Sequence, residues 1–171
     1  MQTTYIALLR AVNVGGTGKL PMVDLRAMAE GLGFTNVRTF IASGNLLLES
    51  LLDEGEVKTK LEVRLGEYAG KPVPVFVRTA AEMRAVKHAN PFPDGHGSRL
   101  MVFFRDDVPP PDLLELVRDQ QGERIALGVR EIYVDYGEGI RHTRLKIPGN
   151  VNGTGRNMNT VAKLAEIVRD A

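Results

Sequence analysis

An apolar run near the start of the chain ends at a cluster of glycines and is followed by the start of a helix. Residues 4–12 are mostly apolar, Asn13 and three glycines come next, and Pro21 precedes apolar residues at helical spacing. A continuous apolar run of this length is typical of a buried strand, and the fixed φ of proline suits the first position of a helix. The segment therefore predicts a buried strand, a glycine-rich turn and a helix in succession.

The segments that follow predict two strands, a helix and one more strand. Residues 36–41 and 46–49 have the composition of strands joined by a turn. Apolar residues recur at helical spacing over Glu56–Ala69, which favours an amphipathic helix. Residues 72–78 form a further strand, whose prolines indicate an edge position. The order β-α-β-β-α-β over residues 1–78 predicts a ferredoxin-like half.

The same order then returns with its last strand missing. A connecting helix and loop over 79–98 lead into a second half, which we expect over residues 99–171. Its predicted elements are a strand at Arg99–Phe104, a proline-led helix at Pro110–Asp119, strands at Arg124–Leu127 and Arg130–Asp135, and a helix from about Asn157 to Arg169. The pattern predicts an α+β protein of two tandem ferredoxin-like halves, β-α-β-β-α-β and then β-α-β-β-α.

The strands carry apolar residues on both faces. In the first strand, Tyr5, Ala7 and Leu9 alternate with other apolar residues. A strand that is apolar on both sides is covered on both sides. We therefore expect the two halves to cover each other and to form a single compact domain.

Composition narrows the classes of function. Hydrophobic residues make up 43% of the chain and charged residues 25%, as in an ordinary globular protein. No apolar run approaches the roughly 20 residues that cross a bilayer, and no secretory signal is apparent. Without cysteine there is no disulfide, thiolate nucleophile or cysteine-ligated metal. We expect a cytoplasmic protein with no membrane partner; the oligomeric state is left open.

Charge is unevenly distributed although the net charge is only +1. Residues 1–23 contain Arg10 and Lys19 but no acid. Residues 139–165 also lack acids and contain the bases Arg141, Arg144, Lys146, Arg156 and Lys163. If the two stretches meet in space they form a positive surface. Chance segregation of solvated charge explains the pattern equally well.

Two loops are predicted to gather at one edge of the first sheet. The ferredoxin-like connection makes the first and second strands parallel, so the glycine turn and the hairpin turn lie at the same end. Amides there offer hydrogen bonds, a lysine offers charge, and glycines allow close backbone approach to an anion. The candidate ligand-binding residues are Asn13, Gly15, Gly16, Lys19, Ser43 and Asn45. Turns also need glycine and asparagine, and this alone explains most of these residues.

The start of the last predicted helix supplies two further candidates. Asn157 has the residue type of an N-cap. Arg156, beside the N–H groups of a helix start, can clamp a phosphate or carboxylate. Capping accounts for Asn157 but not for Arg156, Asn159 and Thr160 together. We therefore expect Arg156 and Asn159 to join the edge described above in one anion-binding site, whose ligand is a phosphate-bearing small molecule.

Several other chemistries are disfavoured. Asn13 and Leu20 stand where a nucleotide-binding P-loop needs glycine and Ser or Thr, and the glycine spacing is not that of a dinucleotide fingerprint. His88, His96 and His142 are far apart, without the spacing of metal ligands. The sequence therefore predicts no metal site and no cofactor.

Two alternatives to a small-molecule site remain open. The acid-free stretches could contact a nucleic-acid backbone in a salt-sensitive manner. The base stacking of RNA-recognition motifs is excluded, because the predicted third strand, 46–49, has no aromatic residue. An enzyme of unidentified type is the second alternative, for which no nucleophile, base and orienting group can be assigned.

Three stretches of the chain resemble a bacterial family catalogued as domain of unknown function 1697. They are 5–16 with Lys19 and Pro21, 33–45, and 156–164. The resemblance spans the whole chain and implies a tandem ferredoxin-like fold, but no settled activity. The chain departs from the family at Met158, where tryptophan is usual, and at 141–145, where a Ser-Lys-Leu run is usual. Any function that depends on that tryptophan or serine is in doubt here.

Overall fold

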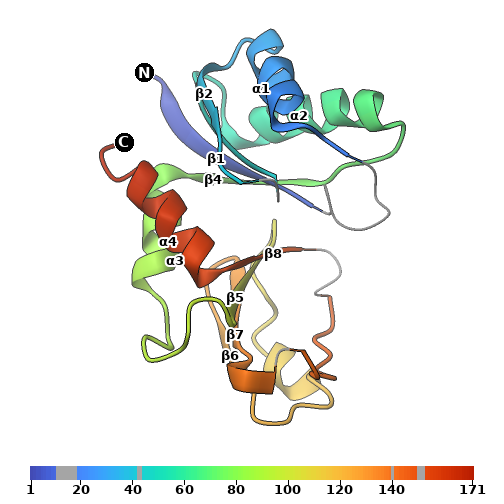
Figure 1. The fold of residues 1–171 in the computed structure, drawn as a ribbon, viewed down its shortest axis with the longest axis vertical. Helices are drawn as coiled ribbons and strands as arrows, with labels where there is room; N and C mark the ends of the chain where they lie inside the picture. The colour runs from blue at the N-terminus through green and yellow to red at the C-terminus, as the bar shows by residue number, and fades with distance from the viewer. Residues whose placement is uncertain (11–18, 42–43, 140, 150–152) are drawn as a thin grey trace. The chain divides into compact units, whose positions relative to one another are not determined.

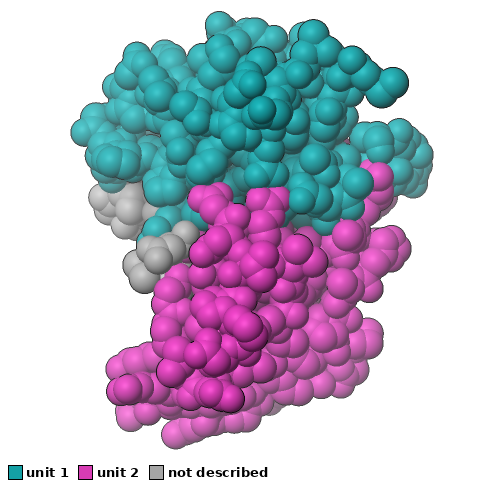
Figure 2. Space-filling view, turned by 180° about the vertical axis from the view of Figure 1, so that it is seen from behind, with its two compact units in different colours: residues 1–83, 168–171 teal, residues 84–167 magenta. Residues whose placement is uncertain are grey.

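The computed structural model describes residues 1–10, 19–41, 44–139, 141–149 and 153–171. The described part of this α+β chain holds four α-helices and two four-stranded antiparallel sheets. The chain divides into two compact units, which are coloured separately in Figure 2. One unit comprises Met1–Met83 with Val168–Ala171, and the other comprises Arg84–Ile167.

The first unit has the element order that the sequence predicts (Figure 1). Its strands lie in the order β2-β3-β1-β4, and all neighbours are antiparallel. The first and second strands therefore run parallel with the third between them, as predicted, and β4 lies at an edge. The elements are β1 (Thr3–Leu9), α1 (Met22–Gly31), β2 (Thr35–Thr39), β3 (Asn45–Ser50), α2 (Glu54–Ala69) and β4 (Val75–Thr79).

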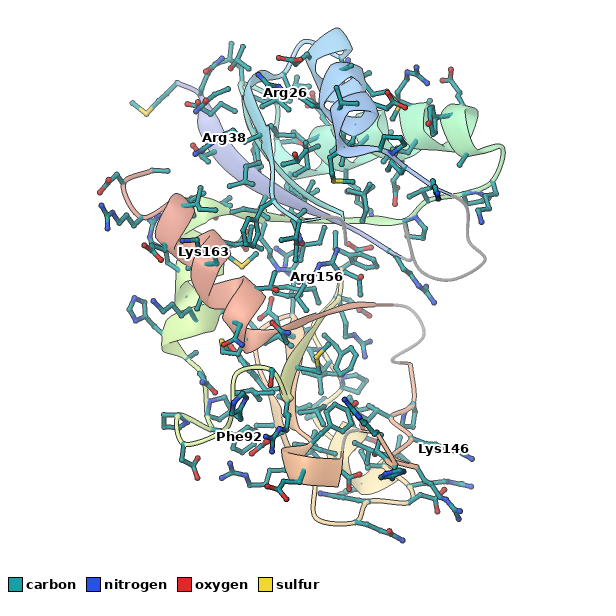
Figure 3. All side chains as sticks on the ribbon, viewed as in Figure 1. Arg26, Arg38, Phe92, Lys146, Arg156 and Lys163 are labelled. Carbon is teal, nitrogen blue, oxygen red and sulfur yellow. The ribbon has the colours of Figure 1, made fainter. Side chains whose placement is uncertain are left out.

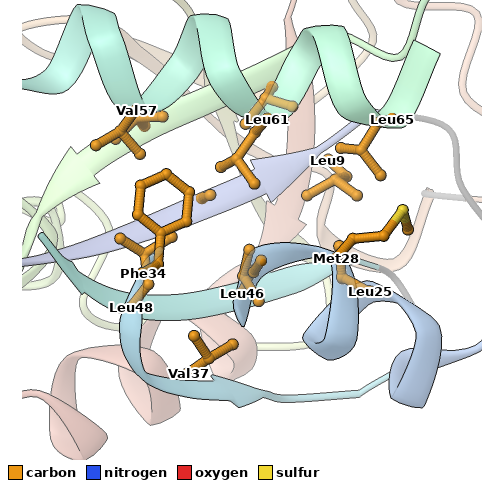
Figure 4. Packing of buried hydrophobic residues seen from close by; sticks show 14 of the residues in the cluster. Leu9, Leu25, Met28, Phe34, Val37, Leu46, Leu48, Val57, Leu61 and Leu65 are labelled. Carbon is orange, nitrogen blue, oxygen red and sulfur yellow. The ribbon is translucent and has the colours of Figure 1, made fainter. Parts of the chain in front are cut away.

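The core of the first unit lies between one face of its sheet and the helices α1 and α2 (Figure 4). Tyr5, Ala7 and Leu9 face this core. The alternate residues of β1, Ile6 and Leu8, are also fully buried. Burial on both faces is what the apolar pattern of β1 predicts. That the two halves cover each other stays a prediction.

Local signals explain where α2 begins and ends. The Asp53 carboxylate accepts a hydrogen bond from the Glu56 N–H at 2.9 Å, which caps the first turn. Gly70 follows the last turn with a φ of 70°, a left-handed conformation that glycine adopts without steric cost. Between these caps, Val57, Leu61 and Leu65 recur at helical spacing and are buried.

The second unit repeats the sheet of the first. Its strand order, β6-β7-β5-β8, matches β2-β3-β1-β4 position by position. The helix α3 begins in the first unit and continues into the second. The elements are α3 (Ala80–His88), β5 (Leu100–Phe104), the 3-10 turn η1 (Leu113–Leu116), β6 (Arg124–Leu127), β7 (Glu131–Asp135), the 3-10 turn η2 (Gly137–Gly139), β8 (Thr154–Asn157) and α4 (Met158–Ile167).

The predicted helix at Pro110–Asp119 is wrong. Only η1 forms there, and by Val117 the backbone is extended. The chain then forms an isolated antiparallel bridge in which Arg118 N donates to Lys146 O at 3.0 Å and Lys146 N donates to Arg118 O at 2.9 Å. This long-range pairing takes the backbone groups that a continuing helix would need.

The prediction that the second half lacks a last strand is also wrong, because β8 pairs with β5. A strand of sequence Thr-Gly-Arg-Asn has no apolar pattern to indicate it. Its fit depends on its neighbour: a Cβ at Gly155 would lie 2.9 Å from Cε1 of the Phe103 ring. Gly155 is therefore a strand residue that lets an aromatic ring approach the backbone.

The second sheet buries residues on both faces. One face packs in a cluster that includes Leu113, Ile132 and Val134. On the opposite face, the buried hydroxyl of Tyr133 donates a hydrogen bond to Val86 O of α3 at 2.7 Å. Burial, and secondarily the negative charge of Glu131, raises the pKa of Tyr133.

We expect Leu61→Ala to lower the free energy of unfolding by about 2–5 kcal/mol, because it opens a cavity in the core of the first unit. The measurement is urea denaturation. Val63→Ala is the matched control: it lies on the same helix with 57% of its surface exposed and should change the free energy by less than about 0.5 kcal/mol. Equal effects of the two substitutions would contradict the packing.

We expect Tyr133→Phe to lower the free energy of unfolding by about 1 kcal/mol near pH 8, because the hydrogen bond to Val86 is lost. The raised pKa adds a pH dependence. Above about pH 10 the hydroxyl ionises more readily in the unfolded chain, so the wild type loses stability that the variant keeps. The difference in free energy of unfolding between the two proteins should therefore shrink as the pH rises past 10. A difference that is constant or grows would contradict the burial of this hydroxyl.

Candidate functional site

The end of β1 lies beside the connection between β2 and β3. Leu9 N donates to Gly44 O at 2.9 Å, and Leu8 is paired with Asn45 in the ladder. Arg10 N donates to Pro74 O at 3.0 Å, just before β4. The strand that enters the glycine-rich segment therefore ends between the hairpin turn and the start of β4.

Four of the predicted ligand-binding residues fall outside the described residues. They are Asn13, Gly15, Gly16 and Ser43. Their gathering at this edge stays a prediction. The described residues that flank them, Arg10 and Gly44, directly follow β1 and directly precede β3, which are neighbouring strands.

Asn45 has a structural role at this edge. Its side chain is fully buried, and Nδ2 donates to Phe40 O at 2.8 Å. The backbone closes the same turn, because Phe40 N donates to Asn45 O at 3.0 Å. Gly44 has a φ of 87°, a conformation that favours glycine. The turn thus needs both residue types for its own geometry.

Lys19 is exposed and precedes the start of α1. Pro21 occupies the N-cap position, where no side chain makes a capping hydrogen bond. Asp24 lies in the first turn of α1, and its carboxylate accepts a hydrogen bond from the Tyr68 hydroxyl at 3.1 Å. The positive end of this helix therefore has an exposed cation three residues before its first residue and one acid inside its first turn.

Arg156 lies in β8, before the last helix rather than in its first turn (Figure 3). Its side chain is buried, and Nη1 donates to Thr154 Oγ1 at 2.8 Å and to Gly155 O at 2.9 Å. Burial lowers the pKa of Arg156 to about 10, so the guanidinium is still protonated at neutral pH. It is a buried cation, and these two hydrogen bonds go to its own strand.

The start of α4 uses its polar groups internally. Asn157 Oδ1 accepts a hydrogen bond from Thr160 N at 2.9 Å, which confirms the predicted N-cap. Asn159 N donates to Gly97 O at 3.3 Å. The Asn159 side chain lies against Gly97, where an added Cβ would be 2.0 Å from Oδ1. Asn159 therefore fastens the helix start to the loop that precedes β5.

Comparison with known proteins assigns the chain to a family. The sequence model of a family described as protein of unknown function (DUF1697) matches residues 2–133. The chain belongs to this family. A solved structure described as conserved bacterial protein SP0830 from Streptococcus pneumoniae is similar to it, with a TM-score of 0.82 and 22% sequence identity. The alignment covers 98% of this chain and 99% of that chain, and the likeness shows the fold. No curated protein matches the chain.

Sequence reasoning missed a polar cluster in the second unit of this DUF1697 chain. Arg124 forms ion pairs with Asp94, at 3.1 Å, and with the buried Asp135. Its guanidinium also lies 4.7 Å from the centroid of the Phe92 ring. Hydrogen bonding to Arg124 lowers the pKa of Asp94. These residues are far apart in the sequence, so no local motif indicates the cluster. Its contacts hold the 90–98 loop to the sheet.

Among the described residues, no group of His, Asp and Glu is arranged so that it could hold a metal ion. Among the same residues, no helix is long and apolar enough to cross a membrane.

We expect Asn45→Ala to lower the free energy of unfolding by about 1–3 kcal/mol, because the Phe40 carbonyl loses the hydrogen bond from Nδ2 inside the protein. Urea denaturation measures the change. Thr59→Ala, on the exposed side of α2 in the same unit, should stay within about 0.5 kcal/mol of the wild type. An unchanged midpoint for Asn45→Ala would show that the amide does not hold this turn.

Proposed function

We propose that the edge of the first unit at the end of β1 binds a phosphate-bearing small molecule. The proposed ligand-binding residues are Asn13, Gly15, Gly16, Lys19 and Ser43, with Asn45 shaping the turn. The observation that supports this most directly is the hydrogen bond from Leu9 N to Gly44 O. This bond joins Leu9, the last residue of β1, to Gly44 in the turn between β2 and β3.

Charge at this edge also favours an anion. Residues 1–23 contain no acid, and Lys19 is exposed. The N-terminus of α1 follows directly and has no side-chain cap. Unpaired N–H groups at a helix start carry about half a positive charge, which together with a lysine suits a phosphate group. Asp24 in the first turn offsets part of this positive charge and so weakens the attraction for an anion.

Arg156 and Asn159 belong to the second unit, and their described bonds favour structural roles. We therefore propose that residues of the first unit hold the ligand. Arg156 and Asn159 are not part of the proposed set of ligand-binding residues. We also infer that each unit has a ferredoxin-like arrangement. The shared strand order of the two sheets supports this inference.

A thermal-shift screen tests the proposal with inorganic phosphate, mononucleotides, sugar phosphates and short oligonucleotides at low and high salt. We expect a mononucleotide or sugar phosphate to stabilise the wild type, by about 2.7 kcal/mol at a hundredfold excess over Kd. The stabilisation should persist at high salt, because a pocket with directed hydrogen bonds depends less on screened charge.

Lys19→Ala should weaken that binding by about tenfold, equivalent to about 1.4 kcal/mol. Lys60→Ala, which removes an exposed lysine from α2, is the matched control and should leave the affinity unchanged. The proposal fails if no anion stabilises the wild type, or if Lys19→Ala binds as well as the control. Stabilisation only by oligonucleotides, lost at high salt, would favour the nucleic-acid alternative.

A further inference from the structure

Three exposed cations of the second unit lie at or beside one short β-bridge. Arg118 and Lys146 are directly opposite each other in this antiparallel bridge, with reciprocal hydrogen bonds of 3.0 Å and 2.9 Å. Side chains of such a pair stand on the same face, with Cα atoms about 5.5 Å apart. All three cations, Arg118, Arg144 and Lys146, are exposed (Lys146 is labelled in Figure 3). We call these three residues the basic bridge.

Burial shows that Arg144 shares the outer face with Lys146. Along this segment the exposed Arg144 and Lys146 alternate with Leu145 and Ile147, which pack in the apolar cluster of the second unit. This alternation has the period of an extended strand. Residues two apart on an extended strand are about 6.7 Å apart. The basic bridge is therefore a compact cluster of positive charge on one face, with apolar residues beneath it.

The arrangement is unfavourable for the protein on its own. Like charges directly opposite on a sheet face are destabilising. Among the described residues, the one ion pair made by these three cations joins Lys146 Nζ to Asp119 Oδ2 at 3.9 Å. Both side chains are more than half exposed, so solvent screens this pair. Neither Arg118 nor Arg144 forms an ion pair with another described residue. One acid therefore balances three bases only in part.

We propose that the basic bridge binds the phosphate backbone of a nucleic acid. A cluster of exposed Arg and Lys side chains attracts the negatively charged phosphates of a nucleic-acid strand. Arg presents a planar fork of donors that fits a phosphate. A lipid surface is favoured less, because surface binding to a membrane normally uses an amphipathic helix, whereas these residues lie on extended backbone. The basic bridge shares no residue with the site proposed at the end of β1, so either proposal can fail alone.

Fluorescence anisotropy with a labelled single-stranded oligonucleotide of mixed sequence tests the proposal on the full chain. Each phosphate contact contributes about −0.7 to the slope of log K against log salt. Three contacts should therefore give a slope of about −2 between about 50 mM and about 200 mM salt. The variant Arg118→Gln/Arg144→Gln/Lys146→Gln should bind at least about tenfold more weakly at the lower salt concentration and with a slope near zero.

The matched control is Arg26→Gln/Lys60→Gln/Arg64→Gln, which removes the same charge from helices of the first unit. It should bind within about twofold of the wild type with an unchanged slope. Single substitutions keep the test valid if the triple variant fails to fold. Arg144→Gln alone should reduce the slope by about 0.7, and Arg144→Lys should restore it because the charge returns.

Three outcomes would overturn the proposal. The first is a wild type that does not bind the oligonucleotide. The second is a triple variant that binds as tightly as the control variant. The third is binding to vesicles that contain phosphatidylserine together with no binding to the oligonucleotide, which would assign the basic bridge to a lipid surface instead.

Discussion

Backbone pairing on both sides of β1 is the constraint on which the first unit depends. This strand is hydrogen-bonded to β3 on one side and to β4 on the other, and its residues are buried on both faces. When both faces are apolar, the alternation of side chains no longer specifies the register of a strand. The register must then be set by turns. Here the hydrogen bond from Leu9 N to Gly44 O holds the end of β1 against the turn between β2 and β3. The bond from Asn45 Nδ2 to Phe40 O holds that turn itself.

The second sheet reaches the same strand order with much less regular structure around it. A four-residue 3-10 turn occupies the place of the first helix, and β8 is a polar edge strand. An edge strand needs only one partner and can be short and polar without exposing an aggregation-prone rim. β8 takes its stability from β5 and from the Phe103 ring over Gly155. The repeat is therefore one of backbone topology rather than of sequence.

This contrast explains which parts of the fold the sequence could predict. Periodicity placed α2 to within two residues of its start, and the prolines before β4 correctly indicated an edge. The strand β8 and the end of η1 could not be predicted, because each depends on a partner distant in the sequence. The same holds for the candidate site. The sequence indicates Asn45 as a polar turn residue and Asn159 as a polar residue of a helix start. Only their contacts show that Asn45 holds its turn and that Asn159 holds the helix start to the 90–98 loop.

The structure also divides the positive charge that the sequence presents as one stretch. Residues 139–165 carry five bases and no acid, yet Arg156 is buried while Arg144 and Lys146 are exposed. Burial lowers the pKa of Arg156 to about 10, and its guanidinium is bonded within β8. Salt-dependent binding arises when exposed cations release the counterions of a polyanion. A buried guanidinium cannot take part in that exchange, so charge counted along the sequence overstates the surface available to an anion.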